Sequence, residues 1–219
     1  MATGETMVAM PDEKRIARAP GTQGYAEQAA ELIPQYESIP FAAHHEAELH
    51  LLPTAPSRIL DIGAGTGLDA AWFAERGHSV LAVEPTAEFR TAAMRLHPSP
   101  LIEWLDDALP NLDAVMGRAQ RFDVVMLSAV WMHLDEAERG IAMPKVASLL
   151  APEGVIVLSL RHGPVPAGRR MFAVSGEETM ELAQQQGLRT LLNTRTESLQ
   201  PGNRAAGVTW TRLAFKHAG

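Results

Sequence analysis

Short apolar runs alternate along this chain with segments in which apolar residues recur every three or four positions. The runs have the length of strands that are buried on both faces of a sheet, and the segments between them have the spacing of amphipathic helices. This alternation is typical of an α/β fold with a parallel sheet and helices on both faces. The predicted strands are residues 58–62, 79–84, a short strand that ends in 104–109, 122–127, 155–160, 188–193 and 208–215.

Capping residues mark where several of the intervening helices begin. Thr86 and Asp135 each precede a predicted helix and are of the type that accepts hydrogen bonds from the free amides of a first turn. Residues 175–178, Ser-Gly-Glu-Glu, have the spacing of a capping box. The last two strands are predicted to pair as a hairpin that is joined across residues 201–203.

The composition fits one substantial hydrophobic core. The chain has 219 residues, of which 46% are hydrophobic, and nothing in it demands a second independent domain. Residues 1–20 are predicted to form a flexible leader, and residues 21–54 accessory helices that cap the site. These helices are expected to break at Pro34 and Pro40. Residues 55–219 are predicted to form the main domain.

Charge and residue usage argue against several classes of partner. The formal net charge is −7 and the pI is about 5.6, which argues against an extended phosphate-binding surface and therefore against nucleic acid. The chain has no cysteine, so neither a disulfide nor a thiolate metal site is possible. No apolar run is long enough for a transmembrane helix. We expect a soluble, cytoplasmic protein without a membrane partner; monomer and homodimer both stay open.

The most informative motif is residues 59–67, Ile-Leu-Asp-Ile-Gly-Ala-Gly-Thr-Gly. A buried strand has Asp61 near its C-terminal end. It leads into a turn whose glycines allow a ligand to approach the backbone closely. The helix that begins at Thr66 or Gly67 directs the free amides of its first turn toward the bend. A turn of this kind predicts a nucleotide-binding site.

The same motif resembles motif I of the class I S-adenosylmethionine-dependent methyltransferases, whose glycines lie against the amino-acid end of the cofactor. A dinucleotide fingerprint would need a glycine at the position of Leu68. The resemblance implies a doubly wound, seven-stranded, mostly parallel sheet that ends in an antiparallel hairpin. It also implies S-adenosylmethionine as cofactor and S-adenosylhomocysteine as product, and it extends from about residue 55 to the end of the chain.

Two acids after later strands extend the predicted cofactor site. Glu84 ends the second strand, where a doubly wound fold delivers a carboxylate to ribose hydroxyls. Asp107 resembles the acid with which the family reads adenine, although Asp106 stands where the family often has glycine; a helix cap is the alternative role for Asp107. The predicted cofactor-binding residues are Asp61, Gly63, Ala64, Gly65, Gly67, Glu84, Pro85, Asp107, Ala108, Leu109 and Ser128.

The pocket for a methyl acceptor is predicted at the carboxyl ends of the fourth and fifth strands. His133 follows the fourth strand and is a candidate general base, because the ordinary pKa of histidine, about 6.5, leaves much of it neutral at pH 7. A structural hydrogen bond is the alternative role for His133. Arg161 ends the fifth strand and is a candidate for binding an anionic acceptor. Trp131 and Tyr25 are further candidates for substrate contact.

Two polar clusters are interpreted as structural. Arg169 and Arg170 are expected in a solvated loop. Residues 44–50, His-His-Glu-Ala-Glu-Leu-His, contain His45 and His50 at a separation of five, whereas a helical zinc site needs histidines four apart. We interpret this cluster as the polar face of a helix and predict no metal site.

These observations favour an enzyme that transfers a methyl group from S-adenosylmethionine to oxygen or nitrogen of a small molecule, which can be anionic. Neither Asn-Pro-Pro-Tyr nor Asp-Pro-Pro-Tyr follows the fourth strand, where amino-directed nucleic-acid methyltransferases of this class carry one. Two alternatives stay open. One is an NAD(P)-binding oxidoreductase, and the other is a regulatory protein that binds the cofactor without catalysis.

Overall fold

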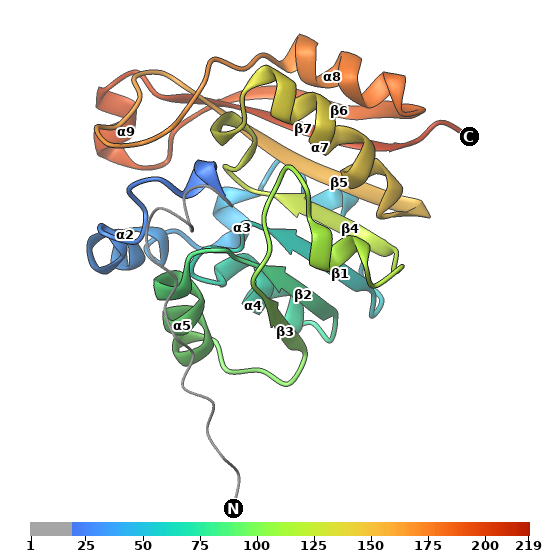
Figure 1. Cartoon of the computed structure of the whole chain (residues 1–219), viewed down its shortest axis with the longest axis horizontal. Coiled ribbons are helices and arrows are strands. Elements are labelled where there is room, and N and C mark those ends of the chain that lie inside the picture. Colours follow the sequence, from blue (N-terminus) through green and yellow to red (C-terminus); the bar gives the residue numbers. More distant parts are fainter. Residues whose placement is uncertain (1–18) are drawn as a thin grey trace, which may run out of the picture.

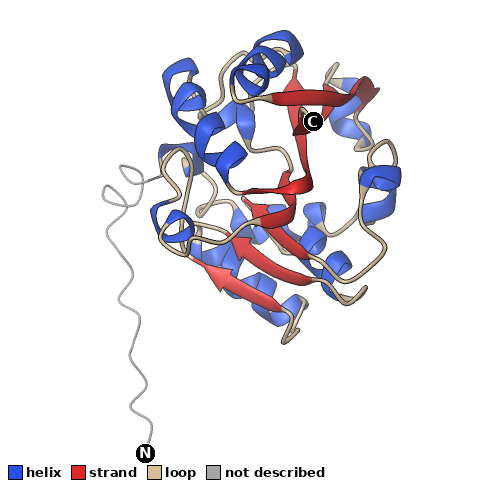
Figure 2. Ribbon diagram, turned by 90° about the vertical axis from the view of Figure 1, so that its right-hand side faces the viewer, coloured by secondary structure: helices blue, strands red, loops and turns tan. Residues whose placement is uncertain are grey.

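The computed structural model describes residues 19–219, which form a seven-stranded sheet with helices on both faces (Figures 1 and 2). The strand order is β3-β2-β1-β4-β5-β7-β6. Strands β1 to β5 run parallel to one another, and β7 runs antiparallel to both β5 and β6. The predicted doubly wound α/β fold is confirmed. The strands are β1 (Arg58–Ile62), β2 (Ser79–Val83), β3 (Ile102–Leu105), β4 (Phe122–Leu127), β5 (Leu150–His162), β6 (Leu188–Glu197) and β7 (Thr209–His217).

The two faces of the sheet carry separate apolar clusters. Helices α3 and α4 cover one face, where Phe73 packs against Ile59, and helices α6, α7 and α8 cover the other, where Met143 packs near Leu60. Successive residues of β1 therefore alternate between the two clusters, as strand geometry requires. The helices are α2 (Ala29–Tyr36), α3 (Phe41–His44), α4 (Leu68–Ala74), α5 (Ala87–Leu96), α6 (Asp113–Met116), α7 (Glu136–Ser148), α8 (Gly176–Gln185) and α9 (Pro201–Ala205), with 3₁₀ turns η1 (Pro20–Thr22), η2 (Leu49–Leu51) and η3 (Trp131–His133).

The predicted caps differ in how completely they form. At α7, Asp135 accepts a hydrogen bond from the Glu138 amide while the Glu138 carboxylate accepts one from the Asp135 amide, which is a full capping box. At α8, Ser175 accepts from the Glu178 amide, but the Glu178 carboxylate binds Arg139 instead of reaching back. Thr86 precedes α5 without a side-chain cap bond.

The predicted hairpin of β6 and β7 is confirmed, and residues 201–203, which join its strands, lie in helix α9, where Pro201 occupies the first helical position at no cost in hydrogen bonds. One prediction about an element break is wrong. Pro34 lies inside α2 without ending it. It stands near the end of that helix, so few intrahelical bonds are affected.

The N-terminal segment packs over the carboxyl edge of the sheet. Ala19 is buried and Pro20 begins η1, so the end of the predicted leader belongs to the fold, while residues 1–18 lie outside the described part of the chain. Tyr36 of α2 stacks on Phe89 of α5, with ring centroids 5.9 Å apart. The segment predicted as accessory helices therefore has its own apolar contacts with the main domain. The division of the chain into residues 21–54 and 55–219 stays a prediction.

Candidate functional site

A cavity of about 490 Å³ lies where the parallel strands end. Its walls come from the turns after β1, β2, β3 and β4, from the end of β5, from the loop before α8, and from the N-terminal segment with η1 and α2. These are the positions at which a doubly wound sheet presents a ligand site. The sequence-predicted residues that line the cavity are Tyr25, Asp61, Gly63, Ala64, Gly65, Glu84, Pro85, Asp107, Ala108, Leu109, Ser128, His133 and Arg161.

The glycine turn after β1 leaves open space in this cavity. Gly63 and Gly65 have φ angles of +73° and +55°, a region that side chains other than glycine rarely adopt. A Cβ atom on Gly63 would lie 2.5 Å from a methyl of Val130, whereas one on Gly65 would have no neighbour nearer than 4.0 Å. Gly65 therefore faces the open cavity. Gly67 begins α4, packs against Trp104 and does not line the cavity.

Buried carboxylates surround the turn. Asp61 is 1% exposed, and its Oδ2 has no hydrogen-bond partner among the described residues. Burial, and then the charges of Asp69 and Glu84, raise the pKa of Asp61 well above its ordinary value. Burial alone would also raise the pKa of Asp69, but the charge and hydrogen bond of His45, with smaller contributions from His44 and Ser128, lower it to about 2. The negative charge of Asp69 is thus compensated by neighbouring groups, whereas that of Asp61 is not.

Glu84 and Asp107 hold the backbone around them while they line the cavity. The carboxylate of Glu84 accepts from the amides of Gly65 at 2.9 Å and Thr86 at 2.7 Å, and burial still raises its pKa. Asp107 accepts from the amide of Ala108 at 2.8 Å and from that of Val115, in α6, at 2.9 Å. Asp107 therefore both caps a helix and lines the cavity, which are the two roles considered for it.

The histidine cluster of residues 44–50 is not a polar helix face. His45 and Glu48 are each 1% exposed. Phe41 stacks on Trp72 at a centroid distance of 4.0 Å and fixes α3 against α4, so that Nε2 of His45 reaches Oδ2 of Asp69 at 2.9 Å. The tertiary contact between two helices turns these polar groups inward.

The tautomer of His133 follows from its two contacts. Its Nδ1 lies 2.7 Å from the carbonyl oxygen of Arg170, which only accepts, so Nδ1 carries a proton. Its Nε2 lies 3.0 Å from the Tyr25 hydroxyl. Burial lowers the pKa of His133 and raises that of Tyr25, so the neutral hydroxyl donates to the neutral ring. The lone pair predicted for a general base is therefore already engaged by Tyr25.

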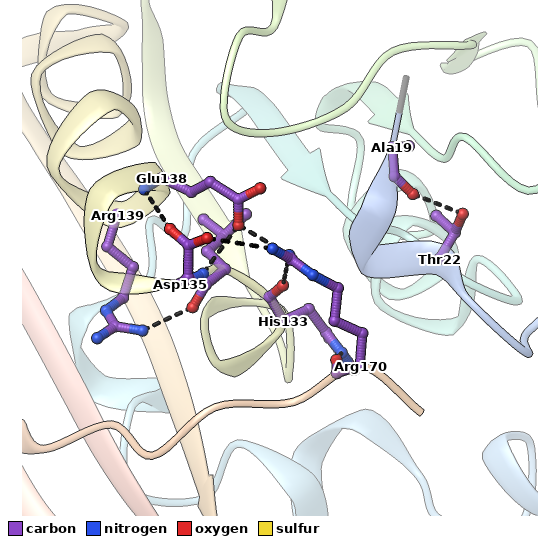
Figure 3. A network of polar contacts seen from close by, with 8 residues as sticks. Ala19, Thr22, His133, Asp135, Glu138, Arg139 and Arg170 are labelled. Atoms are coloured by element: carbon purple, nitrogen blue, oxygen red, sulfur yellow. Dashed lines mark hydrogen bonds and ion pairs between the residues drawn. The ribbon is translucent and has the colours of Figure 1, made fainter. Parts of the chain in front are cut away.

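The arginines of the loop before α8 are engaged by the protein, so the expectation of a solvated loop is wrong. Arg170 donates to the carbonyl of His133 at 2.7 Å and pairs with Glu138 at 2.8 Å and Asp135 at 3.2 Å (Figure 3). Arg169 lies 3.7 Å above the ring of Tyr25. These contacts attach the loop both to the N-terminus of α7 and to the N-terminal segment.

Of the two predicted acceptor-contact residues Arg161 and Trp131, one lines the cavity and the other does not. Arg161 lines the cavity, donates to the carbonyl of Pro164 at 2.8 Å, and has its pKa lowered by burial. Trp131 does not line the cavity, which corrects its predicted placement at the acceptor pocket. It is fully buried in the apolar cluster under α7, because η3 turns its indole toward the sheet.

Sequence reasoning missed Arg212, a cavity residue on β7. The alternation of Trp210, Arg212 and Ala214 places these side chains on one face of the strand, and all three are buried. Arg212 is 4% exposed. A charged residue inside an otherwise apolar alternation was the signal that would have found it.

Over residues 19–219, no group of three or more His, Asp or Glu side chains is arranged to hold a metal ion. Within the same part of the chain, no helix is long and apolar enough to cross a membrane.

The fold and the glycine-turn cavity define a Rossmann-like methyltransferase architecture, and comparison with known proteins supports it. Residues 59–154 match the model of the methyltransferase domain family. An uncharacterized methyltransferase of Mycobacterium tuberculosis is 35% identical over 111 residues, which is 48% of this chain and 40% of that protein. The ubiquinone biosynthesis O-methyltransferase of Bradyrhizobium diazoefficiens is 30% identical over 102 residues, 47% of this chain and 39% of that protein. The chain thus spans about two fifths of the length of these curated relatives.

Solved structures resemble the whole chain. The 1,6-didemethyltoxoflavin-N1-methyltransferase of Burkholderia thailandensis, solved with its substrate and S-adenosylhomocysteine, has a TM-score of 0.70 at 20% identity, over 98% of this chain and 93% of that one. The N-methyltransferase NodS of Bradyrhizobium japonicum has a TM-score of 0.68 at 16% identity, over 89% and 98%. At this identity the likeness concerns the fold. The resemblance to class I S-adenosylmethionine-dependent methyltransferases noted in the sequence is therefore confirmed, through the match of residues 59–154 to the domain family and through the shared fold.

The raised pKa of Asp61 predicts a stability cost at neutral pH. The unfolded chain ionises at the ordinary aspartate pKa and the folded protein above it, so stability falls as the pH rises through this interval. Asp61→Asn cannot ionise and should be more stable than the parent at pH 7 to 8. Each unit of pKa shift is worth about 1.4 kcal/mol, and each kcal/mol about 2–4 °C in Tm.

Thermal unfolding of parent and variant between pH 3 and pH 8 checks this. The gap in Tm should close below the ordinary pKa range of aspartate. A variant that is less stable than the parent at pH 8 would contradict it.

Proposed function

We propose that this chain binds S-adenosylmethionine in the cavity and transfers its methyl group to oxygen or nitrogen of a small-molecule acceptor. The observation that carries the proposal is the buried Oδ2 of Asp61, which has no hydrogen-bond partner among the described residues and belongs to the same cavity as the open space at Gly65. A buried acid without a counter-charge costs stability, which is typical of a site that a cationic ligand completes.

The residues present fit this cofactor. Its amino-acid end carries an ammonium group, and its sulfonium is a second cation, so Asp61, Asp69 and Glu84 offer complementary charge. Glu84 has acceptor capacity beyond its two amide bonds, which suits ribose hydroxyls, and Asp107 to Leu109 would lie against the adenine. A dinucleotide would instead bring its pyrophosphate to these acids. That repulsion disfavours the NAD(P)-dependent alternative.

When bound, the cofactor supplies an electrophilic methyl carbon. The task left to the protein is to hold a nucleophile in line and to keep water away. The N-terminal segment and the loop that carries Arg169 cover the cavity and are joined to each other, because Arg169 stacks on Tyr25 and donates to Gln28 at 2.7 Å. This cover suits the exclusion of water during transfer.

An acidic acceptor fits the side of the cavity near η3. Arg161 and Arg169 both interact electrostatically with the hydroxyls of Tyr25 and Tyr36, so two guanidinium groups and two phenols lie close together there. Guanidinium groups bind carboxylates and phenolates through charge-assisted hydrogen bonds. An acceptor that loses a proton would give it to the Tyr25 oxygen, while the Tyr25 proton passes to Nε2 of His133.

The relatives are compatible with this acceptor class. A ubiquinone biosynthesis O-methyltransferase and a toxoflavin-pathway N-methyltransferase, by their names, modify oxygen and nitrogen of small molecules. We carry over the class of acceptor and leave the particular molecule open.

Calorimetry with S-adenosylhomocysteine and with NAD tests the cofactor. We expect binding of the first and none of the second. Turnover on a panel of carboxylate-bearing and phenolic metabolites, followed by release of S-adenosylhomocysteine, then tests transfer. Binding without turnover on any acceptor would favour the regulatory alternative, and binding of NAD alone would favour the oxidoreductase.

Gly65→Ala should weaken cofactor binding strongly, because its Cβ would project into the cavity. The variant also forces alanine to φ near +55°, at a cost of about 1–2 kcal/mol. Gly77→Ala is a matched control: Gly77 has φ of +83°, and its Cβ would meet nothing within 4 Å, away from the cavity. Calorimetry should show lost affinity for S-adenosylhomocysteine in the first variant alone, with similar small losses of Tm in both. Equal affinities would remove the glycine turn from the cofactor site.

Arg161→Met should raise the KM for an acidic acceptor and leave the affinity for S-adenosylhomocysteine unchanged. Loss of one charge-assisted pair predicts an increase of about ten- to a hundredfold in KM. Arg195→Met, an exposed arginine of β6 outside the cavity, is the control. Steady-state kinetics with any acidic acceptor from the panel checks it. An unchanged KM would make Arg161 a structural residue.

A further inference from the structure

We propose that Arg212 binds the carboxylate at the amino-acid end of the cofactor. This inference rests on the proposed function and deepens it. It gives the amino-acid end two charged partners, an acid for its ammonium and an arginine for its carboxylate.

Arg212 is a buried cation with unused hydrogen-bonding capacity. It is 4% exposed, lines the cavity, and its Nη1 has no hydrogen-bond partner among the described residues. Its charged neighbour Glu48 lies 3.8 Å away, measured from Nε to Oε1, which is too long for a hydrogen bond. Trp210 lies beside it, with the guanidinium carbon 5.6 Å from the ring centroid. A guanidinium in this state is suited to two parallel bonds to a carboxylate.

Asp69 does not satisfy Arg212, because it is already engaged. Its Oδ2 accepts from Ser128 at 2.7 Å and lies 2.9 Å from Nε2 of His45. Asp69 nevertheless interacts electrostatically with both Asp61 and Arg212, and all three residues line the cavity. The cavity therefore presents an unpartnered acid oxygen and an unpartnered guanidinium nitrogen whose residues share Asp69 as a charged neighbour.

This arrangement matches an amino-acid zwitterion. The ammonium and carboxylate of an α-amino acid are attached to one carbon, so they require opposite charges a short distance apart within one wall. Asp61 Oδ2 and Arg212 Nη1 are buried atoms of an acid and a guanidinium that line the same cavity. Neither atom has a hydrogen-bond partner among the described residues, and Glu48 balances the charge of Arg212 without a hydrogen bond to it.

The acceptor is a less fitting source of this carboxylate. The arginines of the acceptor side, Arg161 and Arg169, are grouped by their interactions with Tyr25 and Tyr36. Arg212 shares none of these neighbours; its own are Glu48, Asp69 and His44. The cavity thus has two separate cationic regions, and the one with Arg212 adjoins the glycine turn through Asp69.

Two ligands that differ by the carboxylate alone test the inference. The first is S-adenosylhomocysteine, and the second is the thioether amine in which its carboxylate is replaced by hydrogen. Calorimetry on Arg212→Met should show affinity for the first reduced by about ten- to a hundredfold, and affinity for the amine unchanged. Arg212→Lys, which keeps the charge without the planar fork, should lie between. Arg195→Met serves as the control with parental affinities for both ligands.

The outcomes separate this inference from the proposed function. If Arg212→Met lost the same factor for both ligands, or for neither, Arg212 would not contact the carboxylate, although the cofactor proposal would stand. An increase in acceptor KM with unchanged affinity for both ligands would likewise overturn the inference and assign Arg212 to the acceptor. If the parent bound neither ligand, the proposed function itself would fail. Retained binding of the amine also shows that the variant is folded.

Discussion

The burial of acidic side chains at the carboxyl edge of the sheet constrains much of the surrounding structure. Asp61, Asp69 and Glu84 come from three consecutive segments, and Asp61 interacts electrostatically with both of the others. Like charges in a medium of low dielectric repel strongly unless donors or cations lie between them. The glycine turn provides one such donor, the Gly65 amide, and His45 provides another for Asp69. The close packing of α3 on α4 is therefore tied to the same acids that shape the cavity.

A second set of contacts joins the covering segments to the sheet. Arg170 bridges the carbonyl of His133 and the capping box of α7, so the N-terminus of α7 holds the loop before α8. The carbonyl of Arg170 in turn accepts from His133, which fixes the ring that receives the Tyr25 hydroxyl. The N-terminal segment is thus connected through Tyr25, His133 and Arg170 to a helix on the main domain. Arg170 thus contacts both the capping box of α7 and the histidine that binds Tyr25.

The sequence predicted those features that arise from local pattern. The strand over residues 58–62 and that over 122–127 coincide with β1 and β4, because runs buried on both faces leave little freedom in their assignment. The cap at Asp135 was predicted because an acid stands directly before a helical segment, whereas the capping box predicted at residues 175–178 forms only its Ser175 bond. The glycine turn was likewise predicted from local sequence.

The features that sequence reasoning missed depend on contacts between distant segments. Nothing local to residues 44–50 reveals that His45 turns inward, since its partner Asp69 belongs to another helix. Trp131 was placed at the acceptor pocket because it follows the fourth strand, but the turn of η3 decides the direction of its indole. The engagement of Arg170 likewise depends on acids 32 and 35 residues away. Propensity and spacing do not encode these directions.

Two cationic regions in one cavity can orient the cofactor and the acceptor relative to each other for methyl transfer. A cofactor whose amino-acid end is fixed between opposite charges has one orientation, and its sulfonium then has a fixed position relative to the strand ends. In the proposed function, an acidic acceptor would be held by Arg161 and Arg169, which line the cavity together with Tyr25. If both anionic groups shared one arginine cluster, each ligand would compete for the other's place. Arg212 has Glu48 and Asp69 as charged neighbours, whereas Arg161 and Arg169 interact with Tyr25 and Tyr36, so different groups of the cavity would bind the two anionic ligand ends.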